Sequence, residues 1–259
     1  FAGIAEYDYA GIAMPVDSNY VLGVAFIRFG IDDILNTTNL LDENGNINYN
    51  NISTFSSSDF ASIFSLAKKT KYNLDYGLSA KIIHRKIGPF ASAWGFGLDI
   101  GFQYIFQKWK FGICLKDFTS TLNIWDINEN QYSDQYLESG NYIPEDGIEV
   151  TYPKFSFGVS RNLNFNKDIS CLSALELIAT WDGQRNTIIS SQIINLDPAL
   201  GLELDYKKIG FLRFGFGNFQ KEKLLETLEE NITFQPNFGI GINIWSLFID
   251  YSLTDLGNS

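Results

Sequence analysis

Large apolar residues occupy every second position of residues 91–106, and small or polar residues lie between them. The apolar series runs from Trp94 through Phe96 to Phe106, whereas the other series contains several glycines and Asp99. A period of two predicts a β-strand with two unlike faces. The stretch is longer than a strand of an average globular sheet. We therefore expect one face against lipid and the other against a wet or tightly filled interior.

The same alternation recurs along the chain and predicts twelve strands. Residues 74–82, 200–206, 238–244 and 247–253 all place large apolar side chains at alternate positions. One-sided alternation on this scale favours an antiparallel meander. The predicted strands cover residues 7–14, 20–29, 57–66, 73–85, 91–106, 109–119, 151–162, 172–182, 199–206, 209–219, 235–245 and 246–255.

The connections between these strands mostly alternate between short and long. The short ones are residues 15–18, 67–72, 107–108, 164–168, 207–208 and the junction after Trp245, and the long ones are residues 30–56, 120–150, 183–198 and 220–234. The connection at 86–90 is the exception, because it is short where a long one is due. Short turns at one rim and long loops at the other indicate a transmembrane antiparallel up-and-down β-barrel of the outer membrane.

Charge and tryptophan follow the same division. The loops at 30–56 and 120–150 carry acidic residues and no lysine or arginine, whereas the short turns hold most of the lysines in these connections. Trp109 and Trp245 lie beside short turns, and Trp94 and Trp181 lie near the long loops. This distribution predicts two aromatic girdles at the depths set by a bilayer.

Composition is consistent with this assignment and limits the possible partners. The chain has 259 residues, of which 45% are hydrophobic and 15% aromatic, and its net charge is −11. Because it contains no run of about 18 apolar residues, no transmembrane helix is predicted. The negative charge and the lack of a basic face argue against nucleic acid as a partner. Cys114 and Cys171 fall in different hairpins, and we expect no disulfide between them.

Two segments fit a helix as well as, or better than, a strand. Residues 58–67 begin with Ser58 and Asp59 and would suit a capped amphipathic helix, but the meander requires a strand there. Residues 221–230, KEKLLETLEE, predict a short surface helix within a long loop.

Several stretches resemble one protein family over nearly the whole chain and in the expected order. They are VAFIRFGIDDI (24–34), KIIHRKIGPFASAWGFGLDIG (81–101), DGQRNTIIS (182–190), LDPALGLELDYKKIGFLRFGFGNFQ (196–220), FQPNFGIGI (234–242) and IDYSLTDLGN (249–258). On these stretches the chain resembles the PorV/PorQ family of outer-membrane proteins of the type IX secretion system, which belong to the FadL-like barrels.

The resemblance implies a fold of about fourteen strands, of which about twelve lie in this chain. We expect residues 1–259 to form a single outer-membrane barrel domain without the family's export signal, N-terminal plug segment and last strand. The implied role is non-enzymatic: binding the secretion translocon, receiving cargo that carries a C-terminal sorting domain, or both. The alternative is a FadL-like channel for small hydrophobic solutes. The expected partners are outer-membrane lipid, the type IX translocon and its cargo.

Polar residues with the inward parity would line the lumen of such a barrel. The set comprises Lys81, Arg85, Asp99, Lys110, Lys116, Glu176, Asp182, Glu203, Asp205, Arg213 and Asp250. These side chains could form a polar conduit or a ligand site. The favoured interpretation is a plugged interior held by salt bridges, because charges removed from water need partners. The inward glycines suit a plug that approaches the wall closely.

Three tyrosines of the acidic 120–150 loop, Tyr132, Tyr136 and Tyr142, are candidates for partner contact, because tyrosine is favoured at interfaces. They would equally serve to pack the loop onto the rim.

A third hypothesis, a membrane lipid hydrolase, rests on His84, which is the only histidine. Its parity places it outward near the long-loop rim, and no neighbouring outward serine and polar orienting residue complete a triad. An interfacial histidine is the favoured interpretation.

No cofactor or metal site is predicted. Residues 42–48, DENGNIN, have oxygen-bearing side chains at alternate positions, as in a calcium loop, but Ile47 stands at the sixth position, where glycine is required. An Asn-Gly turn in a polar loop explains the segment better. The paired glycines of residues 95–101 follow strand spacing and no phosphate-binding turn.

Overall fold

The computed structural model describes residues 5–42, 45–132, 137, 140, 142–223, 230–245 and 247–254. Over these residues the protein is all-β, and its strands pair antiparallel. The strands are β1 (Ala5–Pro15), β2 (Tyr20–Asn36), β3 (Ser53–Lys68), β4 (Leu74–Ile87), β5 (Ala91–Phe106), β6 (Trp109–Lys116), β7 (Thr121–Ile127), β8 (Gly147–Thr151), β9 (Lys154–Asn164), β10 (Ile169–Thr180), β11 (Ile189–Ser190), β12 (Asn195–Tyr206), β13 (Gly210–Lys223), β14 (Glu230–Ile244) and β15 (Leu247–Thr254). Two short 3₁₀ helices, η1 (Tyr49–Asn51) and η2 (Glu129–Gln131), lie in long connections.

The main path of the sheet confirms the twelve predicted strands and their order. Hydrogen bonds connect β1-β2-β3-β4-β5-β6-β9-β10-β12-β13-β14-β15, and β7, β8 and β11 lie off this path. The antiparallel all-β prediction is therefore correct. Among the described residues, β1 pairs only with β2 and β15 only with β14, so hydrogen bonds do not close the sheet into the predicted barrel.

The three additional strands lie in connections that we expected to be loops. β5 pairs with β6 over Ile100–Phe106 and with β7 over Ala91–Phe96. β8 then pairs with β7, and the two-residue strand β11 pairs with the start of β12. Part of the 120–150 loop therefore continues the sheet, because β7 supplies hydrogen bonds to the start of β5, which β6 does not reach.

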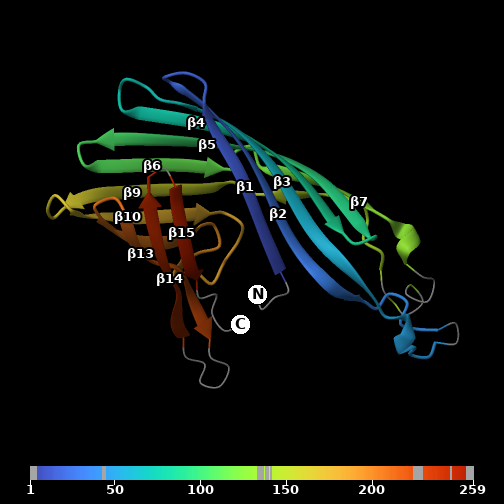
Figure 1. Cartoon of the computed structure of the whole chain (residues 1–259). Helices are drawn as coiled ribbons and strands as arrows, with labels where there is room; N and C mark the ends of the chain where they lie inside the picture. The colour runs from blue at the N-terminus through green and yellow to red at the C-terminus, as the bar shows by residue number, and fades with distance from the viewer. Residues whose placement is uncertain are drawn as a thin grey trace. The chain divides into compact units, whose positions relative to one another are not determined.

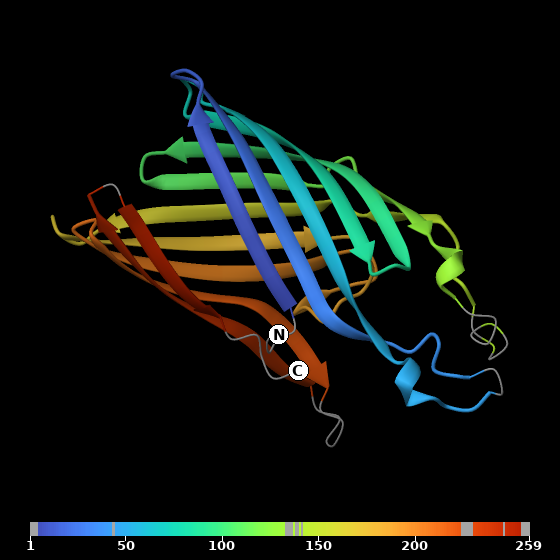
Figure 2. The same cartoon turned by 45° about the vertical axis from the view of Figure 1, so that its right-hand side comes forward.

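Contacts divide the chain into two units, and the first comprises residues 1–67, 78–99 and 119–151. It contains β1, β2, most of β3, the later part of β4, the start of β5, and the hairpin of β7 and β8. Figure 1 shows β1, β2 and β3 side by side. In Figure 2, η1 and η2 lie at one end of these strands and the turn at 16–19 lies at the other. Long and short connections of this unit are thus separated, as the alternation predicted.

The second unit comprises residues 68–77, 100–118 and 152–259. It contains the end of β5, β6, and every strand from β9 to β15. Its short turns at 107–108, 165–168 and 207–209, coloured green, yellow and orange, lie at one end of the strands (Figures 1 and 2). Lys207 and Lys208 both adopt positive φ in the tight turn between β12 and β13.

The two faces of the strands differ as the alternation predicted. In β5, Trp94 and Phe96 are 52% and 56% exposed, whereas Ala93 beside them and Gly95 between them are buried. In β12, Leu200 and Leu202 are about half exposed, on the face opposite Glu203. We call the side that bears Trp94 in the first unit and Leu202 in the second the apolar face, and the opposite side the polar face.

Few apolar side chains are buried. Among the described residues, only Phe90, Ala93, Cys171 and Ala179 are buried hydrophobic residues. Large residues of the apolar face remain well exposed: Leu202, Phe214 and Ile240 are 39–48% exposed. A soluble domain instead buries its large apolar residues in a core between two layers, so the stability of this sheet depends on whatever covers its apolar face.

The two ambiguous segments are both strands where they are described. Residues 58–67 belong to β3, which confirms the strand prediction there. The helix predicted at 221–230 is wrong at its ends, because Lys221–Lys223 continue β13 and Glu230 begins β14. Residues 224–229 lie outside the described residues. Pairing with the neighbouring strand overrides the helix propensity of this charged sequence.

Gly95 tests the packing of the polar face in the first unit. A Cβ at this position would collide with Oδ1 of Asn123, whose residue is 3% exposed, and would lie 3.3 Å from Cβ of Ile83. We expect Gly95→Ala to reduce the free energy of unfolding by about 1–3 kcal/mol, measured from the midpoint of urea unfolding. Gly112→Ala is the matched control, because no atom lies within 4 Å of an added Cβ there. Equal midpoints for the two variants would contradict this packing.

Candidate functional site

The polar face of the second unit carries an arginine held between two carboxylates. Nε of Arg213 lies 2.6 Å from Oε2 of Glu203, and its Nη1 donates to Asp250. The guanidinium also lies over the rings of Phe211 and Phe248, at 5.5 and 5.9 Å from their centroids. Glu203, Arg213 and Asp250, all predicted as lumen-facing, therefore come together on one face from β12, β13 and β15.

Glycines in β14 allow this ion-pair cluster to form. Gly239 and Gly241 lie between β13 and β15 in the sheet register. A Cβ on Gly241 would lie 2.5 Å from Oδ1 of Asp250 and 3.1 Å from Nη1 of Arg213. Because β14 has no side chain there, Arg213 reaches across it to Asp250.

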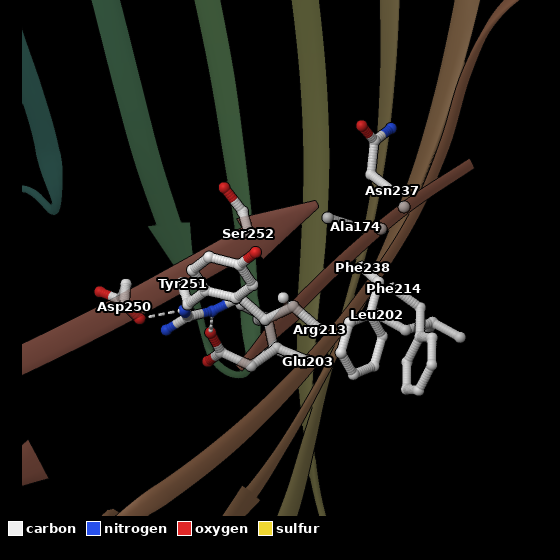
Figure 3. A pocket seen from close by; sticks show the side chains of 14 residues that line it. Ala174, Leu202, Glu203, Arg213, Phe214, Asn237, Phe238, Asp250, Tyr251 and Ser252 are labelled. Atoms are coloured by element: carbon white, nitrogen blue, oxygen red, sulfur yellow. Dashed lines mark hydrogen bonds and ion pairs between the residues drawn. The ribbon is translucent and has the colours of Figure 1, made fainter. Parts of the chain in front are cut away.

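A hollow of about 340 Å³ lies beside this cluster (Figure 3). Small residues of neighbouring strands, including Ala174, Gly201, Gly215 and Gly239, line much of it. The Glu203–Arg213–Asp250 cluster borders it, and Asn237 and Ser252 add polar groups. The hollow is mainly apolar with a few polar groups, which is the usual composition of a small-molecule site.

The polar face of the first unit contains a similar arginine. Nε of Arg85 lies 3.1 Å from Oδ1 of Asp59, and Nη1 lies 2.9 Å from Oε2 of Glu149. The guanidinium lies 5.1 Å from the ring centroid of Trp125, whose Nε1 donates to Oε2 of Glu149 at 2.8 Å. This arginine ties β3 and β4 to the β7–β8 hairpin.

Three other lumen-facing candidates, Lys81, Asp99 and Asp205, fall into two arrangements. Nζ of Lys81 lies 2.8 Å from Oδ1 of Asp99, and both side chains are largely buried. By contrast, Asp205 stabilises a turn: its Oδ1 accepts a hydrogen bond of 2.6 Å from the backbone of Lys208, and its Oδ2 accepts one of 3.3 Å from Ser170. Lys81 and Asp99 thus pair with each other, whereas Asp205 is held by hydrogen bonds from a backbone N–H and a serine hydroxyl.

Sequence reasoning missed a third arginine with two carboxylates. Nη1 of Arg28 in β2 lies 3.1 Å from Glu6 and 3.0 Å from Asp8 in β1. Gly23 faces Ser65 on the polar side, so the register places Arg28 on the apolar face, at the middle of the seventeen-residue strand β2. The cue in the sequence was the pair of acids at alternate positions, Glu6 and Asp8, preceding an arginine in the next strand.

The three candidate tyrosines of the 120–150 loop have different surroundings. The ring of Tyr132 lies 5.6 Å from that of Phe90, so this residue packs the loop onto the sheet. Tyr142 is 90% exposed. Tyr136 lies outside the described residues.

His84 packs against Trp94, with ring centroids 4.5 Å apart. Its Nδ1 is buried and has no hydrogen-bond partner among the described residues. A catalytic triad requires an acceptor that orients this nitrogen, so the geometry gives the lipid-hydrolase hypothesis no support.

The calcium-like segment is a hairpin turn where it is described. Oδ1 of Asp42 accepts a hydrogen bond of 2.9 Å from the backbone of Asn46, and Gly45 adopts a φ of 77°. Glu43 and Asn44 lie outside the described residues. Elsewhere in the described chain, no group of three His, Cys, Asp or Glu residues is placed to hold a metal ion, and Cys114 and Cys171 form no disulfide.

A buried asparagine organises the connection between β10 and β12. Oδ1 of Asn195, a residue only 2% exposed, accepts hydrogen bonds from the backbone of Arg185 at 3.1 Å and from Oγ of Ser190 at 2.6 Å. Its Nδ2 donates to the carbonyl of Gly183 at 2.6 Å. This one side chain therefore satisfies several backbone and side-chain groups of the loop.

Asp182 in the same loop has a perturbed pKa. Burial alone would raise the pKa of this carboxyl, but hydrogen bonds from Arg185 and Thr180 outweigh burial and lower it. A carboxyl whose pKa is lower in the folded state than in the unfolded state stabilises the fold at pH values above its unfolded pKa, which is about 3.9. That stabilisation is lost as the pH falls through the folded pKa.

Comparisons with known proteins do not identify a family. No family model matches the chain, and no curated protein matches it. Among solved structures, FpvA of P. aeruginosa, in complex with pyoverdine and iron, is similar at 11% identity and a TM-score of 0.39. The match covers 92% of this chain and 39% of that chain, and a likeness at this level carries no argument. No helix among the described residues is long and apolar enough to cross a membrane.

The Asp182 interaction can be tested by replacing its partner. We expect Arg185→Gln to raise the pKa of Asp182, because the guanidinium no longer donates to the carboxylate. The backbone hydrogen bonds of residue 185 to Ser190 and Asn195 remain available in this variant. Carbon NMR titration of labelled aspartate carboxyls measures the shift. Arg161→Gln serves as the control, since Arg161 lies over Trp109. An unchanged pKa in Arg185→Gln would refute the assignment.

Proposed function

We propose that this protein is a β-barrel of the outer membrane, with its apolar face against lipid. The observation that carries the proposal is the exposed band of large apolar side chains on alternate positions of neighbouring strands, for example Trp94 and Phe96 in β5 and Leu202 in β12. Lipid covers such a face without a second layer of protein. A closed barrel would also leave neither β1 nor β15 with a free edge.

The ends of the strands support this orientation. Trp109 begins β6 directly after a short turn, and Trp245 lies in the turn between β14 and β15. Trp94 and Trp181 lie towards the ends that carry long connections. Tryptophans at both strand ends suit two membrane interfaces. Arg28 on the apolar face lies eight residues beyond Tyr20 at the short-turn end of β2. Because about 9–11 residues of a tilted strand cross a bilayer, this distance puts Arg28 close to the far interface, where charges cost less than at the bilayer midplane.

Within this class, we propose a non-enzymatic accessory role in type IX protein secretion, at the translocon or with cargo that bears a C-terminal sorting domain. The support is the resemblance of residues 81–101 and 196–220 and of the other stretches to the PorV/PorQ family of FadL-like barrels. The exposed Tyr142 and the acidic connection around it are the surface that we assign to a protein partner.

A second candidate is a FadL-like channel for small hydrophobic solutes, and the hollow beside Arg213 favours it. The floor of that hollow is formed by small residues such as Ala174 and Gly201, and its volume is sufficient for a small molecule. The paired charges at its border count against passage of a purely apolar solute.

Membrane insertion is tested by placing the same substitution on the two faces. We expect Leu202→Arg, on the apolar face, to cost about 2–4 kcal/mol and to block folding into lipid vesicles. Leu172→Arg is the matched control, because Leu172 pairs in register with Glu203 on the polar face. Folding is followed by the mobility shift of unheated samples on gels, with urea titration for stability. If Leu172→Arg were the more damaging change, the two faces would be wrongly assigned.

The secretion role is tested in cells that lack the gene. We expect cargo with C-terminal sorting domains to fail to reach the cell surface, and the wild-type gene to restore secretion. Co-purification of a large translocon barrel with the tagged protein would support the same role. Unchanged cargo secretion would contradict it. Loss of uptake of a hydrophobic solute in the same cells would then favour the channel.

A further inference from the structure

The hollow on the polar face of β10, β12, β13, β14 and β15 has an apolar floor and one charged side. Its floor is open because glycines replace side chains at neighbouring positions. A Cβ on Gly201 would meet only Cβ of Ala174, at 3.9 Å, which is ordinary contact. The space above Gly201 is therefore not needed for packing within the protein, and a flat apolar group can rest on the backbone there.

The charged side of the hollow carries a net negative charge. Glu203 and Asp250 contribute two negative charges and Arg213 contributes one positive charge, which leaves −1. The guanidinium is already engaged by both carboxylates and by the rings of Phe211 and Phe248. The charge of Arg213 is therefore outweighed by the two carboxylates, and an anionic ligand would meet a net negative cluster.

Carboxylate and amide oxygens on the same side remain available as hydrogen-bond acceptors. Oε2 of Glu203 and Oδ1 of Asp250 each accept a hydrogen bond from Arg213. Among the described residues, the other oxygen of each carboxylate has no hydrogen-bond partner. Across the hollow, Nδ2 of Asn237 donates to the carbonyl of Gln235 at 3.3 Å, which leaves its Oδ1 as an acceptor. Such a site is complementary to a ligand that supplies N–H donors and positive charge.

We propose that this hollow binds an organic cation, in which a primary amine contacts Glu203 and Asp250 and a flat apolar body lies on Gly201 and Ala174. The volume of about 340 Å³ is at the lower end of the range for small-molecule sites, which suits a body of one or two fused rings. This ligand site goes beyond the membrane and secretion roles, and it does not depend on which transport role is correct.

Three probes with one indole body and different charges test the proposal: tryptamine, tryptophol and indole-3-acetate. Binding is measured by isothermal titration calorimetry with the purified chain in lipid nanodiscs, and empty nanodiscs provide the reference. We expect tryptamine to bind at least tenfold more tightly than tryptophol, and indole-3-acetate to show no binding. Equal affinities, or tightest binding of the anion, would overturn the proposal.

Variants then locate the site. We expect Glu203→Gln and Asp250→Asn each to reduce tryptamine affinity about tenfold, because each brings the cluster to neutrality. Gly201→Val should abolish binding of tryptamine by filling the floor, whereas Gly112→Val, in a strand that does not line the hollow, should leave it unchanged. The gel mobility shift of unheated samples confirms that each variant folds. Unchanged binding in a folded Gly201→Val protein would place the ligand elsewhere and overturn the proposal.

Discussion

A single hydrogen-bonded layer with one apolar face is the constraint on which the rest of this structure depends. The strands satisfy one another's backbone groups, but no second layer of the described chain covers residues such as Trp94, Phe96 and Leu202. Hydrophobic stabilisation requires that this surface leave water. Whatever covers this face must therefore come from outside the sheet, and lipid chains can cover it in any arrangement of the strands.

The opposite face meets a different requirement, because it collects charge. Arg85 and Arg213 each lie between two carboxylates from other strands and against aromatic rings. Each arginine thereby stabilises carboxylates that would otherwise repel each other on a crowded face. The same arrangement leaves each cluster with one excess negative charge, so the polar face is paired locally and still negative at both clusters.

Period-two patterning predicted the twelve main strands, and parity predicted that Lys81, Asp99, Glu203, Arg213 and Asp250 face one way. It did not predict which charges meet, because partners depend on the register between strands, and register is not visible in a single strand's alternation. β7 and β8 were missed because they are short and lie within a polar, acidic segment. The strand ends at Lys221–Lys223 and Glu230 were missed because their composition favours a helix, whereas pairing across the hairpin decides the outcome.

The reach of Arg213 over Gly241 has a consequence for how β15 aligns with β14. A slip of two residues would keep Leu247, Ile249 and Tyr251 on the apolar face, so hydrophobic patterning alone does not distinguish the two alignments. The slip would, however, carry Asp250 away from the gap that glycine leaves in β14 and would place a different side chain beside the guanidinium. The ion pair that crosses β14 at Gly241 thus fixes the register of β15, among several registers that would expose the same apolar face to lipid.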